Sequence, residues 1–203
     1  MSRDMTTAYD WARADLTLMR RQEFSRRAGG ETQAKDLGPS LWMAAFQTPP
    51  MPAAAARGYH ADLLSLGGAL TTFYLSPVPG EPEARDGETL AGVTIASISS
   101  DNDAVALTGL PAGFVMTAGD YLSIDTGDGI EFHQVAQGGA ANASGVTGEL
   151  RVVPHVRPVV SDGDAVRLVN PRVEMRLQPG SLRHERLNLV LSRVSFEAVQ
   201  VLR

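Results

Sequence analysis

The sequence predicts a mainly β protein with one helix, and three observations lead to that prediction. The stretch Gly109–Val135 alternates short apolar runs with Gly- and Asp-containing turns, as short strands folded on one another do. The wider region 89–170 continues this pattern and suits a barrel of five to six strands. Residues 52–66, PAAAARGYHADLLSL, hold the clearest helical pattern, with Pro in the first turn and four alanines after it.

A β-hairpin is predicted inside the first of these stretches. Tyr121–Ile124 has strand composition, and Ile130–Val135 alternates apolar and polar residues with the period of a half-buried strand. Thr126–Gly129 lies between them, and its glycines accept the positive φ of a tight turn. We therefore expect two antiparallel strands joined at this turn.

Strands are also predicted on both sides of the central region. Alternation in Asp10–Arg21 favours a strand, Ser40–Phe46 is apolar enough for a buried one, and Leu187–Leu202 predicts one long strand or two. Further strands are expected at residues 23–26, 71–75, 91–98, 104–108, 149–153, 164–169 and 173–177. Residues 26–39 and 138–148 are rich in small or polar residues and are expected to be loops.

The charge distribution indicates an inserted domain. The net charge is −5, but residues 86–170 carry three Lys/Arg and eleven Asp/Glu, a net −8 between mildly basic ends. The Pro- and Gly-rich segment Ser76–Glu88 and the pair Asn170-Pro171 are typical domain boundaries. We expect one discontinuous domain, 1–85 plus 172–203, split by a small β-barrel at 86–171.

Composition excludes several classes of function. No run of about 18 apolar residues is present, so no membrane span is expected, and the N-terminus lacks the apolar core of a signal peptide. Cysteine is absent, which excludes disulfides, thiol catalysis and cysteine zinc sites. No segment concentrates basic residues on one face, so specific nucleic-acid binding is not expected.

One short motif matches an enzyme pattern. Leu122–Gly127, LSIDTG, has the apolar-Asp-Thr-Gly order with which aspartic proteases present a catalytic carboxylate. That chemistry needs two aspartates sharing a proton, and the sequence has no second copy of the motif. Because Asp128-Gly129 follows at once, we interpret Asp125 as a turn residue and expect no catalytic residues.

Metal and nucleophile patterns are incomplete. Asp101, Asn102 and Asp103, or Asp125 and Asp128, offer oxygen ligands for calcium, but the twelve-residue EF-hand pattern is missing and turns favour the same residues. The histidines, His60, His133, His155 and His184, lack metal-ligand spacing. Ser181 near His184 lies in an Arg-rich turn, which is weak evidence for a catalytic pair. No metal or other cofactor is expected.

Large aromatic residues are concentrated in the first 75 residues. They form either the core of the outer domain or a subunit interface, since aromatic residues anchor such interfaces, and both roles are compatible. The residues concerned are Trp11, Trp42, Phe46, Phe73 and Tyr74.

These patterns together resemble the tail proteins of long-tailed bacteriophages, most closely the distal tail protein. The resemblance lies in Leu41-Trp42-Met43, the Ala-rich helix ending in Leu63-Leu64, and Phe73-Tyr74-Leu75. It continues in Gly109–Gly113 leading to Gly119–Ser123, and in the ELRVVP run at 149–154, so that it covers most of residues 40–200.

The resemblance implies a β-sandwich domain related to tail-tube subunits, with a flanking helix and, in some members, a split around a barrel like the oligonucleotide/oligosaccharide-binding fold. It also implies a homo-hexameric ring that joins the tail tube protein to the baseplate hub protein and to side fibres. Such a protein is made in the host cytoplasm and is found in the virion, at the tail tip. We expect the ring contacts to come mainly from residues 1–85 and 172–203.

Two alternatives stay open at this point. One is another tail-tube or baseplate component. The other is a carbohydrate-binding module that recognises a host glycan, for which Tyr121, Phe114 and Phe132 are the available stacking aromatics in the barrel region, although their pattern is that of core residues.

Overall fold

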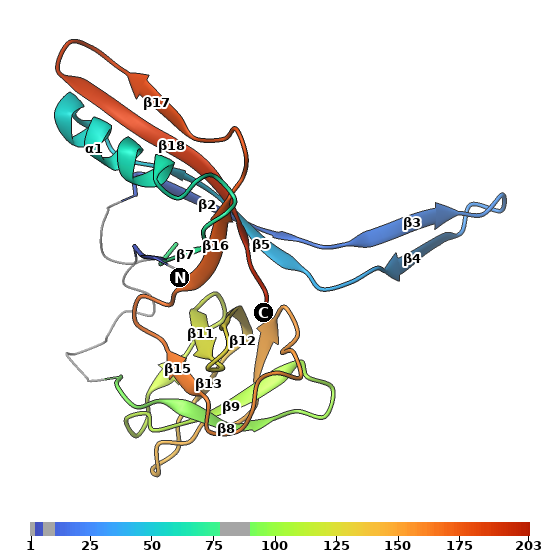
Figure 1. Cartoon of the computed structure of the whole chain (residues 1–203). Helices are drawn as coiled ribbons and strands as arrows, with labels where there is room; N and C mark the ends of the chain where they lie inside the picture. The colour runs from blue at the N-terminus through green and yellow to red at the C-terminus, as the bar shows by residue number, and fades with distance from the viewer. Residues whose placement is uncertain (1–2, 6–10, 78–89) are drawn as a thin grey trace. The chain divides into compact units, whose positions relative to one another are not determined.

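A computed structural model describes residues 3–5, 11–77 and 90–203 of the chain (Figure 1). The chain forms two compact units. Unit 1 comprises Met1–Asp10, Leu70–Met175 and Leu202–Arg203, and unit 2 comprises Trp11–Ala69 and Arg176–Val201.

Six strands of unit 1 close into a barrel in the order β11-β12-β14-β9-β8-β15. Neighbouring strands are antiparallel throughout. Closure leaves no free sheet edge, which removes the groups that would pair with another chain. The predicted barrel is therefore confirmed. Its strands are β8 (Thr94–Ile98), β9 (Ala104–Thr108), β11 (Tyr121–Asp125), β12 (Ile130–Gln137), β14 (Leu150–Val153) and β15 (Ala165–Arg167).

The predicted hairpin between β11 and β12 is also confirmed. Asp125 pairs with Ile130 across the turn, and the Thr126 amide donates a hydrogen bond of 3.1 Å to the Gly129 carbonyl. Gly127 has φ of 82°, the left-handed conformation that its lack of a Cβ allows.

The barrel has an apolar core of its own. Inward-facing side chains alternate along its strands, as at Leu122 and Ile124, both of which are fully buried. The cluster of buried apolar side chains is drawn from residues between Leu90 and Leu168, with Ile98 and Val169 packed against it.

Residues 138–148 are not the exposed loop that their composition predicted. β13 (Gly139–Ala140) pairs with β10 (Val115–Met116), and the Thr147 side chain is buried, accepting a hydrogen bond of 2.9 Å from the Leu107 amide. A Cβ on Gly145 would lie 2.2 Å from the Leu110 carbonyl oxygen. The small residues therefore permit close backbone packing rather than flexibility.

Unit 1 also holds three short strands outside the barrel. β1 (Arg3–Asp4) is parallel to β7 (Phe73–Leu75), and β7 is antiparallel to β16 (Val173–Leu177), of which residues 173–175 belong to this unit. Phe73, Leu75, Val173 and Met175 are all buried.

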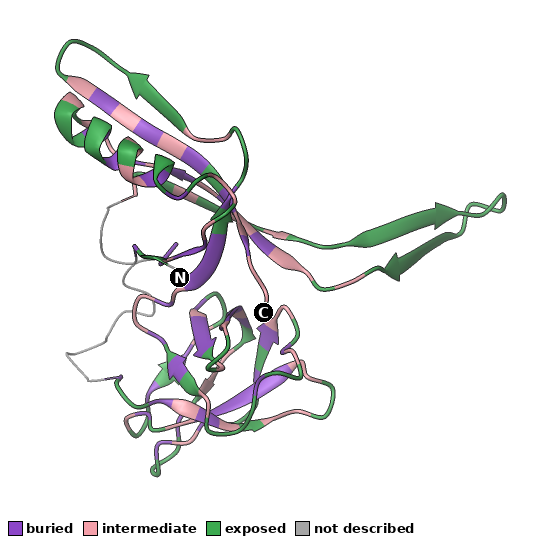
Figure 2. Cartoon of the chain, in the orientation of Figure 1, coloured by how far each residue is buried: buried purple, intermediate pink, exposed green. Residues whose placement is uncertain are grey.

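Unit 2 is an antiparallel sheet in which β5 (Leu41–Gln47) lies between β2 (Arg13–Met19) and β18 (Leu191–Gln200). Two further strands, β6 (Met51–Pro52) and β17 (Arg183–Arg186), pair with β18. Burial alternates strictly along β5 and nearly so along β18, the period-two pattern that predicted both strands (Figure 2).

The predicted helix is α1 (Ala53–Leu64), confirmed to within two residues at its C-terminal end. Its Ala56, Tyr59 and Leu63 are buried, as is Leu66 just beyond it, and Gly67 and Gly68 have positive φ where the chain turns away. Among the described residues α1 is the one helix, and it is too short to cross a bilayer.

Two strands were missed by the sequence analysis. β4 (Thr32–Asp36) lies in the predicted loop 26–39 and pairs with β3 (Gln22–Arg26), while β17 occupies the predicted Arg-rich turn. Every residue of β3, β4 and β17 is exposed, so none carries the alternation of burial on which strand prediction depends.

The split of the outer domain stays a prediction. Its first boundary, near residues 85 and 86, falls in 78–89, which lie outside the described residues. The strands of unit 2 form a single sheet with a helix on one face, so the β-sandwich is likewise not established, whereas the mainly β class and the barrel are.

Candidate assembly surface

The most distinctive surface of unit 2 is the hairpin of β3 and β4, which we call the arm (residues 20–38) and which appears as the long extension in Figure 1. Its turn is closed by a hydrogen bond of 2.9 Å from the Arg27 amide to the Glu31 carbonyl, and Gly30 there has φ of 86°. Arg27 and Glu31 also form an exposed ion pair of 3.4 Å. Local turn chemistry thus folds the arm without tertiary contacts for its ten strand residues.

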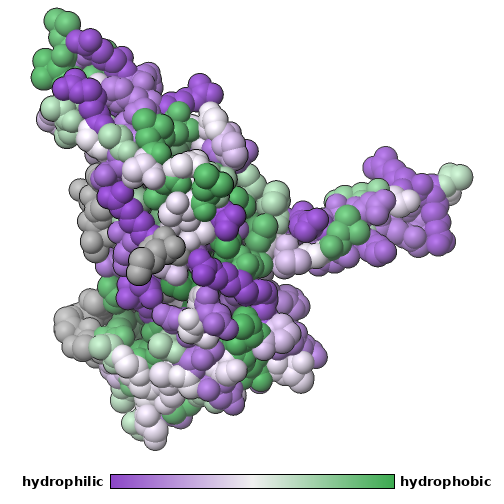
Figure 3. All heavy atoms as spheres, viewed as in Figure 1, coloured by the Kyte–Doolittle hydropathy of each residue, from purple (hydrophilic) through white to green (hydrophobic). Residues whose placement is uncertain are grey.

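The two faces of the arm differ. Glu23 pairs with Lys35 and Ser25 with Gln33 on one face, whereas Phe24 pairs with Ala34 on the other. Phe24 is 71% exposed, and the surface around it is mainly hydrophilic (Figure 3). A two-stranded hairpin is at best marginally stable alone in water. The Phe24 face is therefore built to pack against something else.

β2 gives unit 2 an open sheet edge. It pairs with β5 from Arg13 to Met19, and the described residues contain no strand on its other side. A row of unpaired backbone donors and acceptors is a template for pairing with another chain. By contrast β17 carries the sequence Arg-His-Glu-Arg, the charged composition that protects an edge strand.

The sheet of unit 2 is covered on one face. Tyr59 of α1 lies on the face of Phe46 and Phe196, with Trp11 between them at ring-centroid distances of 4.8 to 6.2 Å. The opposite face carries Met43 and Ala45, both half-buried, and Met19, which is 37% exposed. This second face mixes apolar and charged side chains, as subunit interfaces do.

The aromatic residues predicted for an interface lie mainly inside the chain. Trp42, Phe46 and Phe73 are at most 4% exposed, so they form core. Trp11 is half-buried in the aromatic cluster of unit 2, and Tyr74 is half-buried in unit 1, where the Arg172 guanidinium lies 5.2 Å from its ring centroid. The predicted core role holds for the three buried residues, and the interface role of all five stays a prediction.

Asp125 has the geometry of a turn residue. It ends β11, its Oδ1 accepts a hydrogen bond of 3.1 Å from the Gly127 amide, and its Oδ2 is 3.1 Å from Nη2 of Arg172. Both carboxylate oxygens are thus engaged in holding the turn and its neighbour.

The other candidate ligands are similarly occupied. Asp103 accepts hydrogen bonds from Ser99 and Arg151, which, with the Ser99 contribution the larger, lower the pKa of its carboxyl. In the described parts of the chain no three His, Cys, Asp or Glu side chains form a group that could hold a metal ion. The Ser181 hydroxyl bonds to the backbone of Gln178 and Glu197.

Two histidine arrangements were not visible from the sequence. His60 and His184 lie with ring centroids 5.6 Å apart, from α1 and β17. His133 is fully buried in the barrel, with Nδ1 2.8 Å from the Pro154 carbonyl oxygen and Nε2 lacking a hydrogen-bond partner. Burial lowers the pKa of His133. The imidazole is therefore a neutral structural element, in line with the structural role expected for it.

The aromatic residues considered for glycan stacking are largely hidden. Phe114 is 6% exposed and Phe132 is fully buried, with Tyr121 half-buried and stacked on Phe132 at 5.4 Å. The core role that their pattern favours is confirmed for the two phenylalanines.

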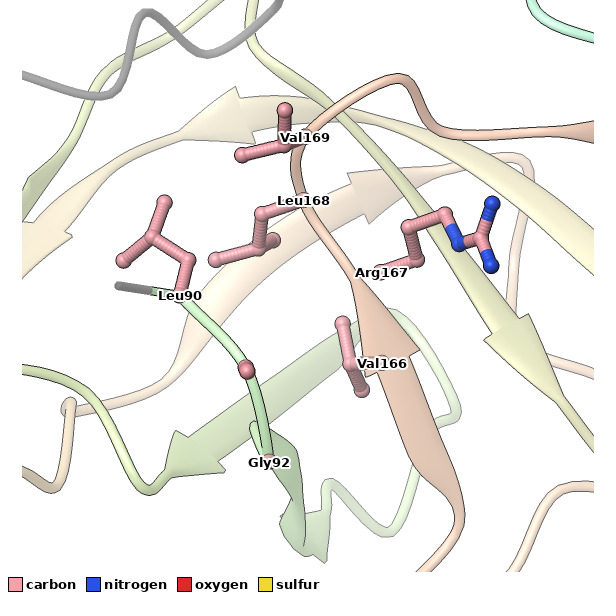
Figure 4. A pocket seen from close by; sticks show the side chains of 7 residues that line it. Leu90, Gly92, Val166, Arg167, Leu168 and Val169 are labelled. Carbon is pink, nitrogen blue, oxygen red and sulfur yellow. The ribbon is translucent and has the colours of Figure 1, made fainter. Parts of the chain in front are cut away.

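One cavity of about 440 Å³ lies at the barrel, lined by apolar side chains and the stem of Arg167 (Figure 4). Leu90, Val166, Leu168 and Val169 form most of its wall. Leu90 directly follows the segment 78–89, so the lining is defined on its described side, and we assign no ligand to this cavity.

Comparison of the sequence with protein-family models and with curated proteins found no match to either.

Proposed function

We propose that this protein is a structural virion protein that forms a hexameric ring at the distal end of a bacteriophage tail, between the tail tube and the baseplate hub. The resemblance of its sequence patterns to distal tail proteins is the origin of the proposal. Its mainly β fold with one helix and a closed barrel agrees with that class at the level of architecture.

The observation that carries the proposal is the combination of the exposed arm and the open β2 edge in one unit. A ring requires a heterologous contact, in which one surface of a subunit fits a different surface of the next. The Phe24 face of the arm and the β2 edge are two such different surfaces. Residues 20–37 carry five Lys/Arg and three Asp/Glu, so the arm itself is mildly basic.

Oligomeric state tests the proposal. The full chain should form a closed ring at high concentration, seen by light scattering and electron microscopy, because subunits that do not bind at low concentration associate by mass action. A variant in which residues 22–36 are replaced by Gly-Gly should stay monomeric while circular dichroism still reports a folded β protein.

A matched control replaces the arm residues Ser25 and Gln33, on the polar face, by alanine and should still form the ring. A wild-type chain that remains monomeric at every concentration and in assembled tails, or a ring that persists without the arm, would overturn the proposal.

A further inference from the structure

Unit 1 buries two carboxylates, each in an ion pair with an arginine. Glu131, on β12, is 3% exposed and accepts a hydrogen bond of 2.8 Å from Nε of Arg157. Glu174, on β16, is fully buried, and Nη2 of Arg203 lies 2.5 Å from its Oε1. A buried carboxylate is tolerated when it is paired, because burial alone strongly disfavours the charge.

The two pairs are connected through Arg203. Nη2 of Arg157 also donates a hydrogen bond of 2.7 Å to the Arg203 carbonyl, so the charged groups run from Glu131 to Glu174 without a break. The Arg203 side chain also passes the β11–β12 turn, where a Cβ on Gly129 would lie 3.3 Å from Cβ of Arg203. This chain of contacts joins a strand of the barrel to β16, outside it.

A second arginine makes a parallel connection. Arg172, which precedes β16, binds Asp125 through its side chain and Ser123 through its backbone amide, at 3.1 Å each, both on β11. The same guanidinium covers the Tyr74 ring of β7. Arg172 and Arg203 thus tie two neighbouring barrel strands to β7 and β16.

We propose that Arg172, Arg203, Arg157, Glu131 and Glu174 form a latch that holds the barrel on β7 and β16, and that opening the latch releases the barrel as a folded body. The barrel has its own apolar cluster, drawn from residues 90–169, so it does not need these strands to complete a core. Leaving Glu174 buried without Arg203 would favour the open state, in which water solvates the carboxylate. The latch lies within unit 1 and is independent of the assembly proposed above.

The experiment is hydrogen exchange of the full chain, followed by mass spectrometry, in wild type and Arg203→Gln. We expect exchange in residues 73–75 and 173–175 to become about tenfold faster or more, because local opening sets the exchange rate of such amides. Amides of β11 and β12 in the barrel core should keep their wild-type rates. Arg151→Gln, which breaks the Arg151–Asp103 pair on the barrel surface, is the matched control and should change neither region.

Two further variants separate the latch from general destabilisation. Arg157→Gln should speed exchange inside the barrel as well, because it strands Glu131 among core residues. Glu174→Gln added to Arg203→Gln removes the stranded charge and should restore part of the lost protection. Unchanged exchange at β7 and β16 in Arg203→Gln, or equal acceleration throughout the barrel core, would overturn the proposal.

Discussion

The barrel and the arm are built from the same antiparallel pairing but differ in what protects it. In the barrel each strand has two neighbours and an inward row of apolar side chains, of which Leu122 and Ile124 are fully buried. In the arm each strand has one neighbour, and all ten strand residues are exposed. Stability of the barrel is therefore internal to it, whereas the arm has apolar surface and backbone groups left over for contacts beyond the chain.

Truncating a core side chain should give the largest effect. Leu122→Ala removes apolar contacts from the barrel cluster and leaves a cavity, so the barrel should lose about 2–5 kcal/mol of its free energy of unfolding. Denaturant titration of the full chain, with hydrogen exchange to assign the loss to the barrel, measures it. Leu189→Ala, at a position 85% exposed in unit 2, is the control and should leave stability unchanged.

The same kind of truncation on the arm should act on association instead. Phe24→Ala leaves the unfolding midpoint unchanged, because the side chain is 71% exposed in the chain. If Phe24 anchors the subunit contact, association should weaken by about 2 kcal/mol, or about thirtyfold. Concentration-dependent light scattering would show this shift, and loss of stability without loss of association would contradict the contrast drawn here.

Acidification should affect the barrel through His133. Burial lowers the pKa of this imidazole below its ordinary value of 6.5, so the unfolded chain binds its proton first as the pH falls. This contribution to the free energy of unfolding is therefore intact above pH 6.5 and declines below it. Hydrogen exchange of the barrel amides between pH 7 and pH 5, corrected for intrinsic rates, measures the decline. His133→Gln should flatten it, and an equally steep decline in that variant would assign it to other groups.

The smallest effect is expected at Asp125. Asp125→Asn keeps an oxygen that can accept from the Gly127 amide but removes the charge paired with Arg172. Because the Asp125 side chain is 47% exposed, the change in stability should be about 0–1 kcal/mol. Thermal unfolding is sensitive enough to detect a larger loss, which would show that the β11–β12 turn depends on this charge.

Prediction from the sequence succeeded where burial leaves a pattern. The alternation in Ser40–Phe46 and the Pro-then-Ala start of α1 gave these elements nearly to the residue. The arm was missed because Thr32–Asp36 is exposed on both faces, and the signal that could have found it is the Ala28-Gly29-Gly30 turn between two polar runs.

The contacts of the latch were out of reach for a different reason. Glu131 and Arg157 are 26 residues apart, and Glu174 and Arg203 are 29 apart, so no local spacing marks them as pairs. Both glutamates lie at positions of alternating strands where an apolar residue is expected. A charged residue at such a position is a signal that a distant partner must exist, although it does not say which.

The arm also has a consequence for the speed of encounter. A strand advances about 3.3 Å per residue, so five paired residues reach about 16 Å from the sheet. A projecting segment enlarges the volume within which a second molecule is first captured, and its net positive charge attracts a partner surface of opposite sign before contact. If the arm is the contact, a version shortened by two residue pairs should therefore bind more slowly, with a dependence on ionic strength that the wild type shows more steeply.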